Sequence, residues 1–353
     1  MKSDTFVIIM AGGIGSRFWP VSTERKPKQF LDMLGTGKTL FQHTIERFSD
    51  ICSVRNIFVV TSAQYIDIAL EQGPEIPESN VLAEPVMRNT APCIAYASYK
   101  IRKLNPNANI IVTPSDHLIE QKQLFQRTLQ KGLNFVKDRD AILTIGIHPH
   151  RPETGYGYIQ MDQSEKEIAK VKAFKEKPDL ETARSYLKHG GYLWNAGIFL
   201  WSVKTIVQAF ETYMPAMARV FENGSEVYFT DKEQRFIDLV YPTFENISID
   251  YSMLEKADNL YVQKARFDWS DLGTWTALWE KSTRSYTGDT VSSENAYLYE
   301  TSNNIIHVPE DKVVVVQGLS EYIVVESNNV LLICSKGEEQ RIKAFRHKAS
   351  NSK

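Results

Sequence analysis

The chain has 353 residues, of which 42% are hydrophobic and 11% aromatic, so it can form one large domain with an appendage or two domains. Its formal net charge of −2 excludes a global basic field, so nucleic acid is not an expected partner and any anion site must be local. No apolar run approaches the roughly 18 residues of a membrane helix, and three scattered cysteines predict neither disulfides nor a zinc site. We expect a soluble, cytoplasmic protein with no membrane partner.

The first 150 residues alternate between short apolar strands and helices. A buried strand over 5–10 ends at a glycine-rich turn. Further strands are expected at 56–61, 81–83, 109–113 and 141–147, with helices at 40–50, 64–70, 90–104 and 121–136. This alternation predicts an α/β fold with a doubly wound, Rossmann-like sheet, which binds ligands at the carboxyl ends of its strands.

From about residue 150 the pattern becomes mixed α+β, with strands expected at 156–161, 171–174, 194–201 and 260–262, so we expect a mixed sheet overall. After about Thr287, short β-rich runs recur about every eight to nine residues with no helix between them. That texture is typical of a small all-β module or a β-solenoid fragment. We therefore expect a large domain over 1–286, a β module over 287–345 and a frayed tail over 346–353.

Alternating apolar residues of the tail are expected to face one shared interior. They are Val313, Val315, Tyr322, Val324, Leu331 and Ile333. Such a small β module leaves an open edge and an apolar end, which must be covered by the large domain or by the tail of a second copy.

A local anion site is predicted in AGGIGSRFWPVSTERKPKQF, directly after the first strand. Glycines let backbone amides approach phosphate oxygens, Arg17 can bind two of these oxygens, and Lys28 adds a point charge. The alternative, a tight turn with a solvated cationic loop, is favoured for Arg25 and Lys26 alone. We interpret the remaining set as a phosphate site, formed by Gly12, Gly13, Gly15, Arg17 and Lys28.

Two familiar phosphate motifs do not match this stretch. A Walker A loop would need glycine at Asp32, five positions before Gly37. A dinucleotide fingerprint would need a third glycine where Phe18 stands.

The stretch instead resembles the signature G-G-x-G-x-R-(L/F)-x-P-x(6–7)-P-K of the nucleoside-diphosphate-sugar pyrophosphorylases, and most closely that of the bacterial mannose-1-phosphate guanylyltransferases. The resemblance continues through AEPVMRNTAPCI, PSDH, ETGYGYI, FKEKP, WNAGIF, DWSDLGTW and the β-rich tail, so it covers nearly the whole chain. Many bacterial relatives carry a phosphomannose isomerase domain, for which this sequence has no room, so isomerase activity is not implied. The resemblance implies a nucleotide-diphospho-sugar transferase fold whose tail is a short left-handed β-helix-like module that helps to form a homodimer.

The reaction implied is transfer of GMP from GTP to α-D-mannose 1-phosphate, which gives GDP-mannose and pyrophosphate. The attacking sugar phosphate is already anionic, so catalysis reduces to positioning and charge neutralisation. By resemblance, Arg17 would hold the leaving pyrophosphate, Lys28 the α/β-phosphates and Lys177 the incoming phosphate. The alternatives are another nucleotide or hexose 1-phosphate, or a non-catalytic nucleotide-sugar sensor or scaffold.

Two aspartates are candidate metal ligands. Asp116 follows a buried strand in IIVTPSDH, and Asp271 lies in WSDLGTW. Carboxylates suit hard cations, although Ser115 or Asp116 could instead cap a helix. The resemblance assigns Mg²⁺ to both aspartates, with Asp268 as supporting structure.

The segment EPVMRNTAP lies between a strand and a helix, and the resemblance places the nucleobase beside it. Glu84 could accept hydrogen bonds from guanine, whereas Arg88 could face phosphate. Asn89 or Thr90 would alternatively cap the helix. Ser115 completes the expected nucleotide-binding set.

Three further motifs are assigned to the hexose phosphate by resemblance. ETGYGYI offers bare backbone for a sugar at Gly155, Tyr156 and Gly157, although a β-bulge would explain its glycines equally. In KEKP, Glu176 could accept from a hydroxyl, and a charged surface turn is the alternative. Asn195 in WNAGIF stands in an apolar strand and must bond to backbone or ligand.

Overall fold

Short runs of β-branched and aromatic residues form the central sheet of the protein, because such side chains suit a pleated, buried backbone. The computed structural model describes residues 4–162 and 166–350, which divide into two units. The first unit contains the residues up to Gly12, Thr44–Ser115 and Ile119–Trp269. The second contains Gly13–His43, Asp116–Leu118 and the residues from Ser270 onward. Residues 13–43 and 270–286 thus group with the tail, whereas the predicted division places its boundary at residue 286.

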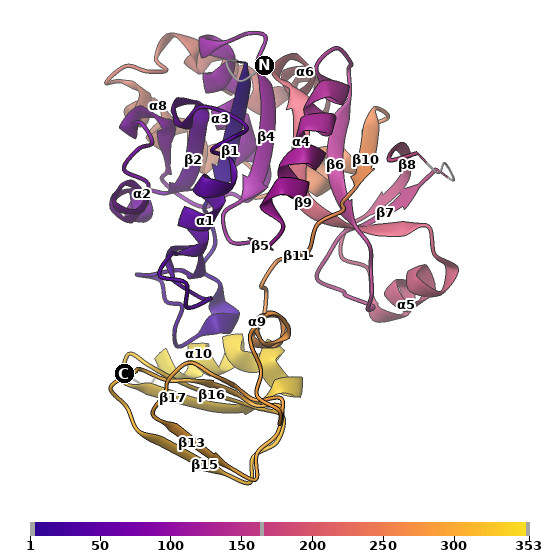
Figure 1. Ribbon diagram of the computed structural model, residues 1–353. Coiled ribbons are helices and arrows are strands. Elements are labelled where there is room, and N and C mark those ends of the chain that lie inside the picture. Colours follow the sequence, from indigo (N-terminus) through magenta and orange to yellow (C-terminus); the bar gives the residue numbers. More distant parts are fainter. Residues whose placement is uncertain (1–3, 163–165, 351–353) are drawn as a thin grey trace. The chain divides into compact units, whose positions relative to one another are not determined.

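The first unit is built on a mixed sheet with the strand order β3-β2-β1-β4-β9-β6-β10-β8-β7 (Figure 1). Strands β1 to β4 pair in parallel, as do β6 and β10, while β9 runs antiparallel to both β4 and β6. The predicted mixed α/β sheet is therefore confirmed. The strands are β1 (Thr5–Met10), β2 (Ile57–Ser62), β3 (Val81–Glu84), β4 (Asn109–Pro114), β6 (Ile142–Ile147), β7 (Tyr158–Met161), β8 (Ile168–Lys175), β9 (Tyr192–Ser202) and β10 (Leu260–Lys264).

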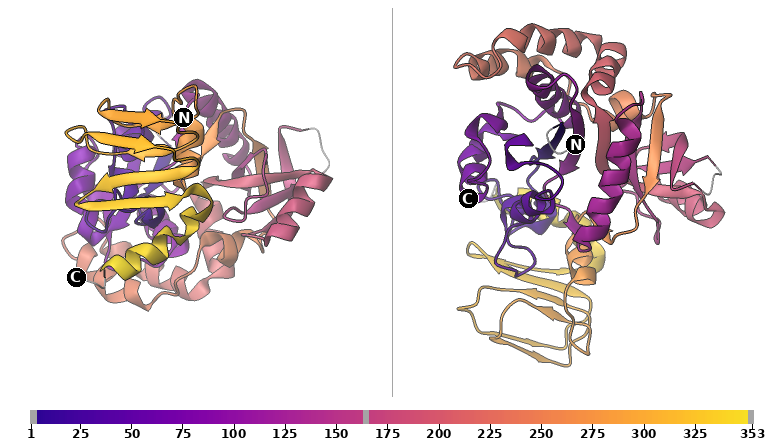
Figure 2. Two further views of the ribbon diagram at one scale, coloured as in Figure 1. Left: turned by 90° about the horizontal axis from the view of Figure 1, so that it is seen from below. Right: turned by 45° about the horizontal axis from the view of Figure 1, so that its top comes forward.

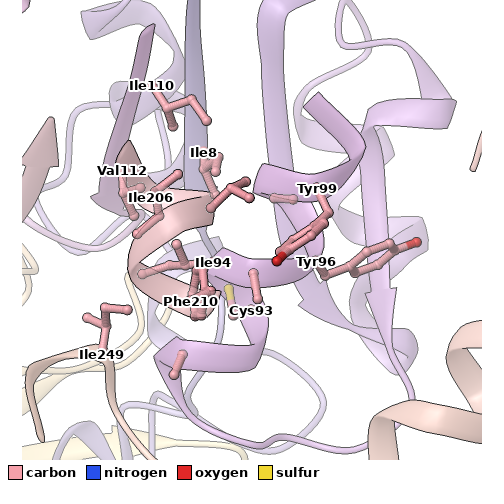
Figure 3. Close-up of a cluster of buried hydrophobic side chains, with 14 of the residues drawn as sticks. Ile8, Cys93, Ile94, Tyr96, Tyr99, Ile110, Val112, Ile206, Phe210 and Ile249 are labelled. Carbon is pink, nitrogen blue, oxygen red and sulfur yellow. The ribbon is translucent and has the colours of Figure 1, made fainter. Parts of the chain in front are cut away.

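Helices cover both faces of this sheet. One face packs on α3 and α6, where Ile8, Ile110 and Val112 of the strands meet Ile94 and Phe210 (Figure 3). Helix α4 covers the other face, where its Gly132 lies against Leu143 and Leu200. The residues next to these two in sequence belong to the cluster on the α3 side, and successive side chains of a strand point to opposite faces. The helices of this unit are α2 (Ile66–Gln72), α3 (Thr90–Leu104), α4 (Lys122–Val136), α5 (Leu180–His189), α6 (Val203–Tyr213), α7 (Pro215–Asn223) and α8 (Glu233–Val240). Helix α1 (Leu40–Arg47) and the short strands β5 (Leu118–Ile119) and β11 (Trp269–Ser270) stand where the chain passes between the units.

Helices α5 to α8 lie in the part of the chain that the sequence pattern predicted only as mixed α+β, without positions for its helices. Helix α6 begins VKTIV, a β-branched run that favours a strand by propensity. Its local helix signal is Ser202, whose side chain accepts a hydrogen bond from Thr205 N at 3.0 Å. Burial of Ile206 and Phe210 against α3 overrides the propensity.

The tail forms two small sheets that lie beside helix α10 (Figure 2). Strands β12, β14 and β16 pair in parallel, β17 adds antiparallel to β16, and β13 pairs in parallel with β15. Parallel pairing of strands so close in sequence requires the chain to coil. The elements are α9 (Trp275–Lys281), β12 (Thr290–Val291), β13 (Ala296–Tyr299), β14 (Ile305–His307), β15 (Val314–Gln317), β16 (Tyr322–Ser327), β17 (Val330–Ser335) and α10 (Ile342–Ser350).

The prediction of a single shared interior for six tail residues is wrong for most of them. Val313, Val315, Leu331 and Ile333 are 70%, 66%, 60% and 54% exposed, and Tyr322 is only partly buried. Only Val324 lies in the cluster between the two sheets, with Ile306, Val308 and Val316. The opposite face of the larger sheet also packs, because Ile323, Val325 and Leu332 join Phe18 and Trp275 in a second cluster. Alternation alone could not show that both faces of β16 are covered.

The frayed end predicted from residue 346 is replaced by helix α10, which continues to Ser350. Ile342 is fully buried and Phe345 packs on the Phe18 cluster, while Arg346 pairs with Glu24. Residues 351–353 lie outside the described residues.

All three cysteines are buried free thiols. Within 4–162 and 166–350, no helix combines the length and hydropathy needed to cross a membrane.

Candidate functional site

The glycine turn after β1 is built around Lys28. Gly15 adopts a φ of 68°, and a Cβ at this position would lie 2.5 Å from the Lys28 Cβ, so only glycine lets the chain pass so close. Lys28 N donates to Ile14 O at 3.3 Å, and Gln29 Nε2 donates to Gly13 O at 3.2 Å. These bonds hold the turn against the segment that follows Pro27.

The Lys28 ammonium is buried and has three acceptors around it. Nζ lies 2.9 Å from Asp116 Oδ2 and donates to the carbonyl oxygens of Asp271 and Leu272, each at 2.8 Å. A lysine has three donors, so this set matches its capacity. Leu272 has a φ of 44°, a conformation that costs energy for a branched residue and is held by these contacts. Lys28 therefore ties PSDH to WSDLGTW, which differs from the expected point charge on a phosphate.

The two predicted metal ligands contact this ammonium through different groups, Asp116 through its carboxylate and Asp271 through its main-chain carbonyl. Burial opposes the charge on Asp116, but the Lys28 ammonium and His117 outweigh it and lower the pKa of the carboxyl. Asp271 Oδ1 accepts from Gly273 N at 3.0 Å, which orients the second carboxylate. Two anchored carboxylates fit Mg²⁺, which uses one or two carboxylates and takes its remaining ligands from water and substrate phosphates.

Arg17 lies in the 3-10 turn Ser16–Phe18, as part of the same unit. Its Nε donates to Gln340 Oε1 at 2.8 Å, which uses one of the five donors of the guanidinium. Gln340 belongs to the turn Lys336–Arg341 that precedes α10, and no sequence motif indicates this partner. The C-terminal segment thus orients Arg17.

The segment predicted to read the base is tied to other parts of the first unit. Asn89 caps α3, because its side chain accepts from Thr90 N at 2.9 Å, and its own φ is 67°. Thr90 Oγ1 accepts from Ile249 N at 2.9 Å, and Arg88 Nη2 donates to Pro242 O at 2.6 Å. Asn89 therefore caps the helix, which is the alternative to base binding that the sequence analysis gave for it.

Glu84 lies in the core and not on a surface that a base could reach, because only 4% of the residue is exposed. Its Oε1 accepts a hydrogen bond from the Tyr241 hydroxyl. Burial raises the pKa of Glu84 to about 7, and the bond from Tyr241 opposes that rise. This placement differs from the predicted contact of Glu84 with guanine.

The stability of the Glu84→Gln variant relative to wild type is expected to increase as the pH rises. The folded form holds the Glu84 proton up to pH 7, whereas the unfolded form releases it near its ordinary pKa of 4.5, so wild-type stability falls between these values. The free energy of unfolding of Glu84→Gln should gain about 2 kcal/mol on wild type between pH 5 and pH 8. Denaturant unfolding at both pH values measures this gain, with exposed Glu78→Gln as the control. An equal pH slope in wild type and Glu84→Gln would contradict it.

The predicted sugar-phosphate residues converge in the first unit. Glu176 Oε1 lies 3.1 Å from Lys177 Nζ, and Lys177 has a φ of 45°. A Cβ at Gly157 would lie 2.5 Å from Glu176 Oε2, so with Glu176 in this position the chain passes its carboxylate as bare backbone. Asn195 N donates to Gly157 O at 2.8 Å.

One member of this cluster was missed by the sequence interpretation. Asp250 Oδ1 accepts from Asn195 Nδ2 at 2.9 Å. Asp250 begins a π-helical turn over Asp250–Leu254, a rare form that is frequent at functional sites. In the sequence SIDYSML, Asp250 looks like any acidic residue beside apolar ones. Only its contact with Asn195, which is distant in the sequence, shows that it belongs to this cluster.

The other predicted residues lie at the edges of these groups. Gly12 is exposed directly after β1, and Ser115 is buried, with its carbonyl accepting from Thr44 Oγ1 at 3.1 Å. Gly155 N donates to Glu153 Oε1 at 3.0 Å, and the ring of Tyr156 contacts that of Trp194.

Comparison with known proteins gives a consistent result. The family model described as Nucleotidyl transferase matches residues 6–287. The chain is 33% identical over 351 residues to mannose-1-phosphate guanylyltransferase 2 of Escherichia coli O157:H7, which covers 95% of this chain and 71% of that protein. It is 34% identical over 348 residues to the mannose-1-phosphate guanylyltransferase of Salmonella montevideo, with 95% and 72% covered. A crystal structure from Thermus thermophilus, described as a mannose-1-phosphate geranyltransferase, superposes with a TM-score of 0.87 at 27% identity and covers 98% of this chain and 99% of that one.

Proposed function

This chain belongs to the nucleotidyl transferase family, and we propose that it transfers GMP from GTP to α-D-mannose 1-phosphate, giving GDP-mannose and pyrophosphate. The curated relatives that carry this activity in their names match 95% of the chain. The nucleotide-diphospho-sugar transferase fold that the resemblance implied is confirmed.

The observation that carries the proposal is that one buried ammonium holds both the Asp116 carboxylate and the main-chain carbonyl of Asp271, which brings the two segments together. These residues are far apart in the sequence, and only Asp116 forms an ion pair with the ammonium. Mg²⁺ bound by the two carboxylates would neutralise phosphate charge. Lys28 keeps both carboxylate segments in place, so we assign it a positioning role.

Each of the remaining groups is assigned to one of the two anionic substrates. Arg17, held by Gln340, would bind the leaving pyrophosphate, and Lys177 would bind the phosphate of the sugar. The main-chain amides of the glycine turn would approach the nucleotide phosphates. Because the attacking oxygen is already anionic, no side chain has to remove a proton.

Release of pyrophosphate tests the activity. We expect turnover with GTP and mannose 1-phosphate to exceed that of other pairs drawn from four nucleoside triphosphates and several hexose 1-phosphates. A preference for another pair would mean that the substrates are not GTP and mannose 1-phosphate. If no pair releases pyrophosphate, the alternative of a non-catalytic nucleotide-sugar sensor or scaffold would be favoured.

The tail forms a β-helix-like module in this proposal, and it takes part in a homodimer. Support comes from the parallel pairing of β12, β14 and β16 and from apolar side chains that the chain itself leaves exposed. These are Tyr297, Tyr299, Val313, Val315, Leu331 and Ile333. A cytoplasmic location also stays a prediction.

Leu331→Glu combined with Ile333→Glu should convert the homodimer to monomers while the protein stays folded, because both side chains are already exposed. Light scattering measures the mass, and Glu338→Gln on the exposed turn that follows β17 serves as the control. A monomeric wild type, or a double variant that stays dimeric, contradicts the proposal.

A further inference from the structure

The amide of Asn195 is fixed from three sides. Its Oδ1 accepts from Thr144 Oγ1 at 2.9 Å and from Gly197 N at 3.1 Å. Its Nδ2 donates to Asp250 Oδ1 at 2.9 Å. Two donors on one side and a carboxylate on the other allow only one orientation of the amide, and one Nδ2 hydrogen remains beyond the bond to Asp250.

Glu176 presents a buried acceptor beside this amide. The residue is 8% exposed, and its Oε2 has no hydrogen-bond partner within the described part of the chain. Gly157 is the residue whose missing Cβ leaves room at Oε2. An unmet buried acceptor costs about 1–3 kcal/mol, so a donor that arrives from outside the chain would stabilise this arrangement. A sugar hydroxyl is such a donor.

We infer that Asp250 is a positioning residue of the sugar-phosphate subsite: it fixes the Asn195 amide, and it places its own carboxyl in the subsite where Glu176 Oε2 can accept from a sugar hydroxyl. This inference rests on the proposed function, because it takes the ligand to be a hexose phosphate. Asp250 is not expected to touch the reacting phosphorus and has no catalytic role.

The charges around Asp250 give the cluster a pH dependence. Burial raises the pKa of Asp250 to about 7, and the neighbouring Glu176 carboxylate adds to the rise, while Lys177 and Ser248 oppose it. Glu255, whose Oε1 accepts from Glu176 N at 3.1 Å, adds another carboxylate to the cluster. Below pH 7, Asp250 is neutral and still accepts from Asn195. Above that pH, a second negative charge stands beside Glu176, where it repels an anionic sugar phosphate.

Binding of GDP-mannose, measured by calorimetry at pH 6.5 and pH 8.5, tests the inference without turnover. GDP is the control ligand, because it lacks the sugar. For wild type, Kd for GDP-mannose should weaken about tenfold more than Kd for GDP across this range. Asp250→Asn mimics the neutral acid and should lose this excess, whereas exposed Glu245→Gln should keep it.

A second variant tests the contact with Asn195. Asp250→Ala should weaken GDP-mannose about tenfold at pH 6.5, where wild-type Asp250 is neutral, and adding Asn195→Ala should weaken it little further, because the two side chains act as one unit. In turnover, the KM for mannose 1-phosphate should rise while the KM for GTP stays unchanged.

The outcomes separate this inference from the activity. If Asp250→Asn keeps the wild-type excess, or if GDP binding changes in parallel, Asp250 has only a general structural role and the inference fails. If wild type releases no pyrophosphate but shows the excess, the proposed activity fails and the inference stands. If GDP-mannose does not bind at either pH, both are overturned.

Discussion

Replacing Arg17 by alanine is expected to lower kcat by about 10²–10³ while the fold stays intact. Loss of one charged contact to a developing pyrophosphate removes about 2–4 kcal/mol of transition-state stabilisation. Arg17 is partly exposed and its side chain donates to Gln340 on the turn before α10, so little of the core depends on it. Steady-state pyrophosphate release measures kcat, and thermal unfolding checks the fold.

The control for this prediction is Arg25→Ala, which removes an exposed cation from the same segment. It should leave kcat within about twofold of wild type, because a solvated charge is screened. Gln340→Ala should have an intermediate effect, since it only releases the guanidinium from one bond. A near-wild-type kcat for Arg17→Ala would remove Arg17 from the mechanism.

Lys28→Met is expected to lower the free energy of unfolding by about 3–5 kcal/mol as well as activity. Methionine keeps the length of the side chain, but it leaves the Asp116 carboxylate and the carbonyls of Asp271 and Leu272 without their donor. Orphaned buried acceptors cost about 1–3 kcal/mol each, and a broken buried ion pair adds to this. Denaturant unfolding measures the loss.

Lys26→Met, at an exposed position two residues earlier, should change stability by less than about 0.5 kcal/mol. The comparison distinguishes the two roles considered for Lys28. If Lys28 served instead to bind phosphate, Lys28→Met would lower activity and leave the stability of the substrate-free protein unchanged. If Lys28→Met unfolds with wild-type stability, the positioning role is wrong and the role implied by the resemblance is restored.

The tail shows the limit of pattern analysis for the fold. Alternation predicted strands from Thr287 onward, and the structure has them. The alternation did not show which set of alternate residues is buried. Strand β16 is covered on both faces, whereas β15 is covered on one. Period-two patterns give the two faces of a strand, but the neighbours of each face come from the whole chain.

The candidate site also combines features that the sequence determines with features that only the tertiary structure decides. The amino-acid sequence by itself determined the strand–glycine turn, the alternation of strands and helices in the first half, and the motifs that carry Arg17, Asp116 and Asp271, because each consists of residues close together along the chain. Only the tertiary structure decided that Lys28 is bound by internal acceptors and that Glu84 turns into the core toward Tyr241. It alone placed Asp250 against Asn195. These facts depend on hydrogen bonds between distant segments, and local sequence does not specify which acceptor a buried donor will meet.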